Sequence, residues 1–194
     1  MRKLTLACLI IVNVVLTSVA APPAPVLKEI RITQTGLLKS IVVEAYNFNI
    51  VLDSVGSIIG VETFASPGDK SNYSIEKDRI KSQLDKNIYC VFNGGELRHI
   101  DELQFTYNRT QNDRVDMIGT MKIDYESKLG KLGRVERIGG FTITYSYPQA
   151  KVKSIGSIEF YYDIDNKRIE RFASRSTDRS NLVVKIFHPA EDFR

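Results

Sequence analysis

Few side chains in this sequence belong to the types that carry out covalent or metal chemistry. The histidines are His99 and His188, and the cysteines are Cys8 and Cys90. A zinc site on two histidines needs further ligands, and neither a His-x-x-x-His nor a Cys-x-x-Cys spacing occurs. Cys90 lies in an apolar run, which raises a thiol pKa and disfavours a nucleophilic Cys–His pair. We therefore expect two surface histidines and a buried, unpaired Cys90 thiol.

The remaining candidate motifs are incomplete. The sequence has no Gly-x-Ser-x-Gly elbow of a serine hydrolase. Asp163-Ile-Asp165-Asn166 resembles part of a calcium loop but lacks its glycine and distal glutamate, so we interpret it as a polar turn. The adjacent carboxylates Asp101 and Glu102 occur without any other glycosidase feature. The sequence thus predicts no catalytic residue, no metal and no cofactor, and a protein that is not an enzyme.

Two tripeptides are acceptors for N-linked glycans. They are Asn72-Tyr73-Ser74 and Asn108-Arg109-Thr110. Each follows or adjoins a predicted turn, where a glycan can face water. Asn72 and Asn108 are therefore the candidate modification sites.

The N-terminus has the three parts of a secretory signal peptide. Arg2 and Lys3 precede an apolar stretch from Leu4 to Leu16, and small residues follow up to Ala20. The apolar run is shorter than the ~20 residues that cross a bilayer. We expect residues 1–20 to be removed and the mature protein to be secreted, extracellular and without a membrane span.

Charge and cysteine content narrow the class further. The chain has 27 Lys+Arg against 23 Asp+Glu, and loss of Arg2 and Lys3 with the signal leaves 25 against 23. The two signs alternate, so nothing resembles a nucleic-acid-binding face. Cys90 would then be the sole cysteine, so no internal disulfide forms. A mature chain of about 170 residues suits one domain whose core is large enough without one.

Internal repeats decide the predicted fold. Each copy has an aliphatic residue, an isoleucine three positions later, and alternating apolar positions that end at tyrosine. The last four copies start 18, 20 and 17 residues apart, which indicates strand-turn units of about 18 residues. The five copies are Leu38–Tyr46, Leu97–Tyr107, Val115–Tyr125, Val135–Tyr145 and Val152–Tyr162.

The second half of each copy alternates with period two, which is typical of a half-buried antiparallel strand. A glycine stands where the alternation shifts by one residue, and we interpret this as a β-bulge or a bend that turns the strand. The inward residues should form one continuous core, and the tyrosines should lie in it and at strand ends rather than line a sugar or lipid site. The glycines are Gly119, Gly139 and Gly156, and the inward residues are Ile118, Met121, Ile123, Ile138, Phe141, Ile143, Ile155, Ile158 and Phe160.

These patterns predict an all-β protein of antiparallel sheets, arranged as a sandwich, a meander barrel or a prism-like assembly. Weaker strand patterns occur at Leu52–Ile58, Arg168–Phe172 and Leu182–Phe187. One helix is possible over residues 74–84, although a strand fits there almost as well. Residues 21–29, rich in proline, should be an extended start, followed by a single domain over 30–194.

Two stretches resemble the small secreted insect proteins of the multiprotein bridging factor two family. The first is Ser66-Pro-Gly-Asp69 with Tyr73, and the second runs from Gly133 through the Gly139-Gly140 pair to Tyr162. That family takes its name from a transcriptional co-activator role, whereas a signal peptide predicts a role outside the cell. The run from Ile100 to Tyr107 is also similar to jacalin-type β-prism lectins.

The sequence as a whole favours a secreted, non-enzymatic β-domain that binds an extracellular ligand, glycan or partner protein, and not a nucleic acid. The alternative is a structural protein that assembles into an extracellular coat or matrix through its strand edges.

Overall fold

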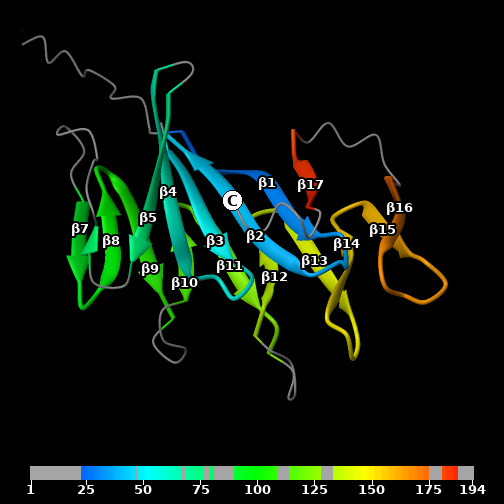
Figure 1. The fold of residues 1–194 in the computed structure, drawn as a ribbon. Helices are drawn as coiled ribbons and strands as arrows, with labels where there is room; N and C mark the ends of the chain where they lie inside the picture. Colours follow the sequence, from blue (N-terminus) through cyan, green and yellow to red (C-terminus); the bar gives the residue numbers. More distant parts are fainter. Residues whose placement is uncertain are drawn as a thin grey trace, which may run out of the picture.

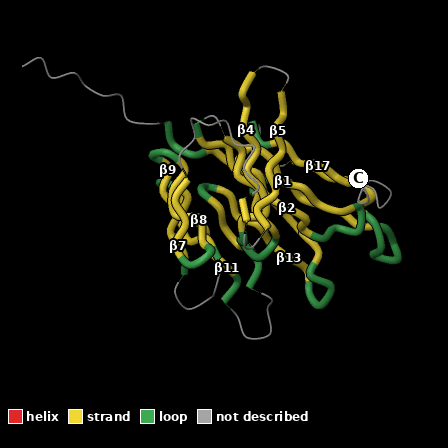
Figure 2. Tube along the Cα trace, turned by 60° about the vertical axis from the view of Figure 1, so that its left-hand side comes forward, coloured by secondary structure: helices red, strands yellow, loops and turns green. Residues whose placement is uncertain are grey.

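The computed structural model describes residues 23–46, 48–66, 69–76, 79–80, 90–108, 114–127, 133–174 and 181–187, with side chains described outside 63–80. This part of the chain is all-β and contains no helix (Figures 1 and 2). The helix considered over 74–84 is wrong where it can be compared, because Ser74–Glu76 and Arg79–Ile80 are strand. The predicted signal peptide at 1–20 and His188 lie outside the described residues.

The first sheet has seven strands in the order β17-β1-β2-β3-β4-β5-β6. Strands β1 to β6 follow one another in antiparallel pairs, whereas β17 joins the edge of β1 in parallel. The strands are β1 (Val26–Thr33), β2 (Leu38–Ala45), β3 (Phe48–Asp53), β4 (Ile58–Ser66), β5 (Asp69–Glu76), β6 (Arg79–Ile80) and β17 (Val183–Phe187).

Strand β1 begins inside the stretch that we expected to be an extended start, so residues 26–29 belong to the sheet. Glu29, a buried carboxylate of β1, ties this strand to β17 by pairing with Lys185 at 2.6 Å. It also accepts a hydrogen bond from Arg31 of its own strand at 2.5 Å. Burial opposes ionisation of Glu29, but the two cations outweigh it and lower its pKa. The parallel edge strand is thus held by charge as well as by its backbone.

The second sheet is an antiparallel meander of ten strands in the order β16-β15-β14-β13-β12-β11-β10-β9-β8-β7. Each strand pairs with its neighbour in sequence, as regular repeats predict. The strands are β7 (Cys90–Asn93), β8 (Glu96–Ile100), β9 (Leu103–Tyr107), β10 (Val115–Ile118), β11 (Met121–Tyr125), β12 (Val135–Ile138), β13 (Phe141–Ser146), β14 (Lys151–Ile155), β15 (Ile158–Tyr162) and β16 (Ile169–Ser174).

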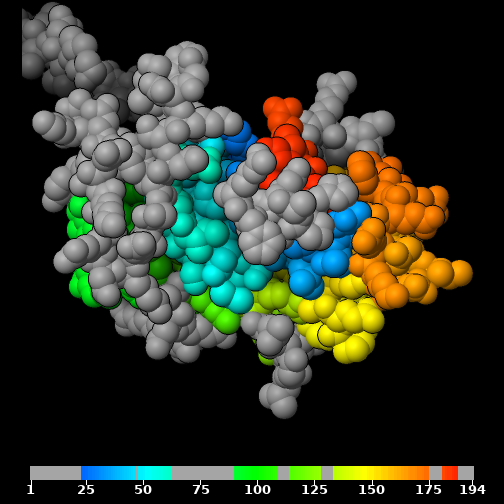
Figure 3. All heavy atoms as spheres, viewed as in Figure 1, coloured from blue at the N-terminus to red at the C-terminus, as the bar shows by residue number. Residues whose placement is uncertain are grey.

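The two sheets enclose one hydrophobic core, to which both contribute (Figure 1). In the space-filling view the first sheet, in blue and cyan, lies in front, and the green and yellow hairpins of the second sheet emerge below it (Figure 3). Ile30, Ile41 and Ile50 line it from the first sheet, and Ile118 and Ile138 from the second, all fully buried. Neither sheet closes on itself among the described strands, so the barrel alternative is wrong. The fold is a two-sheet sandwich, one of the predicted arrangements.

The repeat unit is a hairpin rather than a single bent strand, which corrects the β-bulge interpretation. Ile118 pairs directly with Met121, and Ile138 with Phe141, across two-residue turns. The first turn residue has positive φ, +54° at Gly119 and +55° at Gly139, a conformation that favours glycine and the primed hairpin turns. The shift in alternation therefore marks a chain reversal, and each unit of about 18 residues supplies two strands.

The first predicted copy, Leu38–Tyr46, does not form such a hairpin. It is one strand, β2, of the first sheet, and it pairs with β3 without interruption. The weaker strand pattern at Leu52–Ile58 contains the turn between β3 and β4. The repeats of the second sheet are therefore the last four copies, which we call the tyrosine hairpins: β8–β9, β10–β11, β12–β13 and β14–β15.

The predicted core is largely confirmed, with seven of its nine residues buried and Phe141 and Ile158 half-buried at its margin. Replacing Phe160, which is 5% exposed, with alanine should lower the free energy of unfolding by about 3–5 kcal/mol. Phe141→Ala should cost less, roughly 1–2 kcal/mol, because only part of its surface leaves water on folding. Urea unfolding of the two variants measures this order.

The matched control is Thr142→Ala, at an exposed position on β13, which should change stability by no more than about 0.5 kcal/mol. If Thr142→Ala proves as damaging as Phe160→Ala, the inward and outward faces are assigned the wrong way round.

Candidate functional site

A row of four tyrosines closes the tyrosine hairpins at the end opposite their turns. In each hairpin the phenol donates a hydrogen bond to a backbone carbonyl ten residues earlier, at 2.5–2.8 Å. The acceptor belongs to the first residue of the repeat, so the bond joins the two ends of one hairpin. The pairs are Tyr107 with Leu97, Tyr125 with Val115, Tyr145 with Val135 and Tyr162 with Val152.

A cation lies over the ring of each tyrosine in the row, 4.3–5.5 Å from its centroid. In three of the four hairpins this cation immediately precedes the residue whose carbonyl the tyrosine binds. The sequence carries this signal, a basic residue before the aliphatic position, but the repeat template did not include it. The pairs are Arg98 with Tyr107, Arg114 with Tyr125, Arg134 with Tyr145 and Lys151 with Tyr162.

Turns of the first sheet cover this row. Val115 N donates to Gly56 O at 3.1 Å and Val152 N to Gly36 O at 2.8 Å, so backbone hydrogen bonds connect the two sheets here. A Cβ on Gly56 would lie 2.0 Å from the Tyr125 hydroxyl, and φ is +85° there, so only glycine fits. The tyrosine row therefore forms a covered structural seam, as the sequence interpretation preferred, and not an open site for a sugar or lipid.

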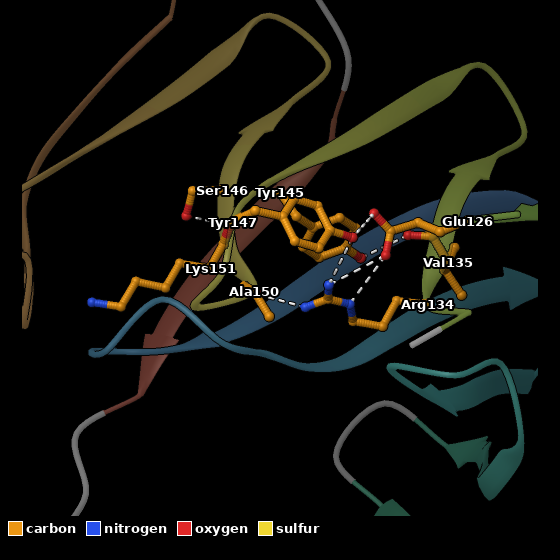
Figure 4. Close-up of polar contacts among 8 residues, drawn as sticks. All are labelled: Glu126, Arg134, Val135, Tyr145, Ser146, Tyr147, Ala150 and Lys151. Carbon is orange, nitrogen blue, oxygen red and sulfur yellow. Dashed lines mark hydrogen bonds and ion pairs between the residues drawn. The ribbon is translucent and has the colours of Figure 1, made fainter. Parts of the chain in front are cut away.

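A buried ion pair extends the seam at the third tyrosine hairpin (Figure 4). The Arg134 Nη2 atom lies 3.2 Å from Glu126 Oε2, and both side chains are less than a tenth exposed. Arg134 also donates from Nη1 to the Ala150 carbonyl at 2.7 Å. The Tyr147 hydroxyl donates to Glu126 Oε1 at 3.0 Å and lies 3.4 Å from Arg134 Nη2. We call Glu126, Arg134 and Tyr147 the ion-pair cluster.

The chemistry open to the ion-pair cluster is limited. Glu126 accepts from both partners and Arg134 cannot give up its proton, so neither is available as a general acid or base. Ser146, drawn beside the cluster in Figure 4, donates its hydroxyl to the Lys151 carbonyl at 3.4 Å and not to the cluster. The cluster connects the β11 end to the β12–β13 and β13–β14 segments, which is a structural role that the sequence analysis did not foresee.

Cys90 and His99 lie on the neighbouring strands β7 and β8, but Cys90 is opposite Ile100 and His99 is opposite Val91, so their side chains point to different faces of the sheet. Cys90 is half-buried rather than buried, because β7 is the last described strand at that edge. Burial, and then the Asp101 carboxylate, raise the pKa of its thiol, which weakens it as a nucleophile. Within the described part of the chain, no three His, Cys, Asp or Glu side chains gather to hold a metal ion.

The two glycosylation candidates stay predictions. Asn108 lies just after β9 and is half-buried, next to a predicted loop. Asn72 stands within β5, opposite Glu62 of β4, and not in a turn. The Asp163–Asn166 segment is the polar turn between β15 and β16, as expected, with the Asp163 carboxylate accepting from backbone N–H groups of Lys167 and Arg168.

A groove of about 450 Å³ lies at the opposite end of the hairpins, where their turns meet the start of β1. Pro25 and Leu103 lie within 3.3 Å of the point where a Cβ on Gly119 would stand, so the first strand is close to the turns. We call this the turn groove. Its lining is mainly apolar, and Lys122 is its sole titratable side chain: Pro25, Val26, Leu27, Thr120, Met121, Lys122, Ile138, Gly139, Gly140 and Phe141.

No protein-family model, curated protein or solved structure matches the chain. The described residues also contain no helix with the length and apolar character to cross a membrane. The site must therefore be judged on its geometry, which offers a covered polar seam at one end and an open apolar groove at the other.

The ion-pair cluster yields a stability prediction. Arg134→Met should lower the free energy of unfolding by about 3–5 kcal/mol, since it leaves Glu126 charged and buried without its cation. The double variant Arg134→Met with Glu126→Gln should recover part of that loss. Chemical denaturation of both variants measures the difference, with Arg137→Met, at an exposed position of β12, as the control. An Arg134→Met variant as stable as the wild type contradicts the prediction.

Because of the tyrosine row, the free energy of unfolding should depend on pH. Burial raises the pKa of Tyr125 and Tyr145, and raises that of Tyr162 to about 12. A tyrosine in the unfolded chain ionises near pH ~10. The folded state therefore holds these protons more tightly, and stability present below pH ~10 should fall as pH rises toward 12. Unfolding at several pH values should show a shallower fall in Tyr162→Phe, and an unchanged slope contradicts this.

Proposed function

We propose that this protein is a non-enzymatic binding domain that works outside the cell and takes an apolar part of its ligand into the turn groove. The observation that carries the proposal is the chemistry of the groove lining. Apolar surface dominates it, which suits burial of a ligand, while its single charged group is an ammonium. An acid–base pair or nucleophile would have to come from elsewhere, so binding is the activity that the groove favours.

The position of the groove supports the same proposal. Two hairpin turns and the first strand supply its walls, so its shape depends on rigid, hydrogen-bonded elements. Gly139 N donates to Lys122 O at 3.0 Å, which fixes one turn against the neighbouring hairpin. Lys122 itself pairs with Asp124 at 3.0 Å and stays largely exposed at the rim. A ligand with an apolar body and a polar or anionic end would suit this arrangement.

The alternative is an assembly protein of an extracellular coat or matrix. The specific observation in its favour is the exposed edge strand β16, in which Phe172 is 63% exposed. Sizing chromatography with light scattering separates the two proposals, because a monomer at micromolar concentration argues against assembly. The signal peptide supports secretion in both cases. The resemblances to the multiprotein bridging factor two family and to jacalin-type lectins stay predictions.

The groove proposal is tested by filling the groove. A Cβ on Gly140 meets nothing within 4 Å and its φ is not positive, so Gly140→Trp should fold normally and occupy the groove. The mature protein is screened on glycan, lipid and peptide arrays, and each hit is titrated with both proteins. We expect Gly140→Trp to weaken binding at least tenfold.

The control is Ser157→Trp, at the matching turn position of the next hairpin, which does not line the groove. It should bind like the wild type. No binding to any class, or equal binding by wild type and Gly140→Trp, would overturn the groove proposal.

A further inference from the structure

The edge strand β16 occupies the place of a fifth hairpin's first strand. In each tyrosine hairpin after β8–β9, the first strand starts with a basic residue, an aliphatic residue and a large apolar residue three positions later. Arg168, Ile169 and Phe172 repeat this spacing. The weaker strand pattern at Arg168–Phe172 is thus a copy of the first half of the repeat unit.

The backbone register confirms the correspondence. In β13–β14, Tyr145 pairs with Val152, the register then shifts, and Ile143 pairs with Ile155. In β15–β16, Tyr162 pairs with Ile169, the register shifts at the same place, and Phe160 pairs with Phe172. Ile169 N also donates to Gln34 O of a first-sheet turn at 2.9 Å, as Val152 N does to Gly36 O.

The second half of this fifth unit is missing from the described strands. After Ile118, Ile138 and Ile155 the chain reverses and a second strand covers them, and each is at most 1% exposed. Strand β16 runs straight on to Ser174, and none of the described strands pairs with its outer edge. Phe172, the counterpart of those isoleucines, is 63% exposed as a result.

We propose that the outer edge of β16 binds an extended segment of a partner protein, which adds as an antiparallel strand with the pattern apolar-x-apolar-x-tyrosine. That pattern is the one all four second strands share, for instance Ile158, Phe160 and Tyr162 of β15. The first apolar residue of the segment packs beside Phe172, and its tyrosine donates to the Ile169 carbonyl. Strand addition supplies main-chain hydrogen bonds, and the alternate side chains supply specificity.

A charge on β16 narrows the sequence that we expect of the partner segment. In the β14–β15 hairpin, Ser154, which precedes Ile155, pairs with Glu159, which follows Ile158. In β16 the counterpart of Ser154 is Arg171, which is exposed and stacks on Tyr161 at 4.5 Å. An acidic residue at the second position of the incoming segment complements it. The β15 sequence has this residue, so a β15 peptide is a suitable probe.

A second copy of this chain fits the edge less well. Strand β16 itself lacks the alternating apolar pattern that ends at tyrosine. A symmetric antiparallel pair centred on Glu170 or Arg171 places like charges directly opposite each other, which is destabilising. The proposal therefore commits to a partner segment and does not depend on the turn groove, which is lined by the start of β1 and the turns of β10–β11 and β12–β13.

The test titrates a fluorescent peptide copying residues 157–163 with the mature protein and follows anisotropy. We expect saturable binding that weakens at least tenfold in Phe172→Ser and in Arg171→Glu. Ile164→Ser, a fully exposed apolar residue in the neighbouring turn, is the matched control and should bind like the wild type. A peptide of the same composition in scrambled order should not bind, and replacement of the peptide's final tyrosine by phenylalanine should weaken binding severalfold.

Hydrogen exchange locates the bound peptide. Amides of residues 170–174 should gain protection while β15 keeps its own. No binding, equal binding by all variants, or loss of protection in β15, which would mean displacement of that strand, overturns the proposal. A concentration-dependent dimer that excludes the peptide overturns it in favour of self-association. Gly140→Trp should bind the peptide normally, so failure here is distinguishable from failure of the groove proposal.

Discussion

The hydrogen bond from a tyrosine to a carbonyl ten residues earlier is the interaction on which this sandwich depends. It closes each tyrosine hairpin at its open end, where the strands would otherwise separate, and it occurs four times in the same register. First-sheet turns then rest on the row, with glycine where the phenol leaves no room for a Cβ. The same bond therefore fixes the register within the second sheet and the placement of the first sheet against it. Because each of these phenols donates its proton to a backbone carbonyl, the hydroxyls are committed to the hairpins and are not available to a ligand.

Much of the fold is predictable from alternation alone. Ile123 and Ile143 point inward and Lys122 and Thr142 outward because a strand with one face on a core needs that order. The repeats also predict a meander, since short units of one pattern pair with their neighbours. The parity shift at Gly119 was misread because a bulge and a two-residue turn have the same local signature in one sequence. Only the pairing of Ile118 with Met121 distinguishes them.

The sites were less predictable because they join residues that are far apart in the sequence. The turn groove needs Pro25 beside the turns of two hairpins, and the order of strands that places it there is not written in any local pattern. Glu126 and Arg134 look like ordinary surface charges until the Tyr147 turn folds over them. Cys90 was expected to be buried because its run is apolar, but β7 has a described neighbour on one side only. By contrast, the basic residue before three of the four hairpins was visible in the sequence and signals the cation that lies over the tyrosine ring.

The parallel pairing of β17 with β1 has a consequence for how the molecule is made. Val183 pairs with Glu29 of the first strand, so the first sheet lacks its β17 edge until the chain has been synthesised as far as residue 183. Local hairpins can form early, but this contact has the largest sequence separation among the described strand pairs, and such contacts form slowly because a long loop must close. Until then β1 presents an open strand edge, and Glu29 has Arg31 but not Lys185 as a cation partner. The first sheet is complete only when β17 pairs with β1.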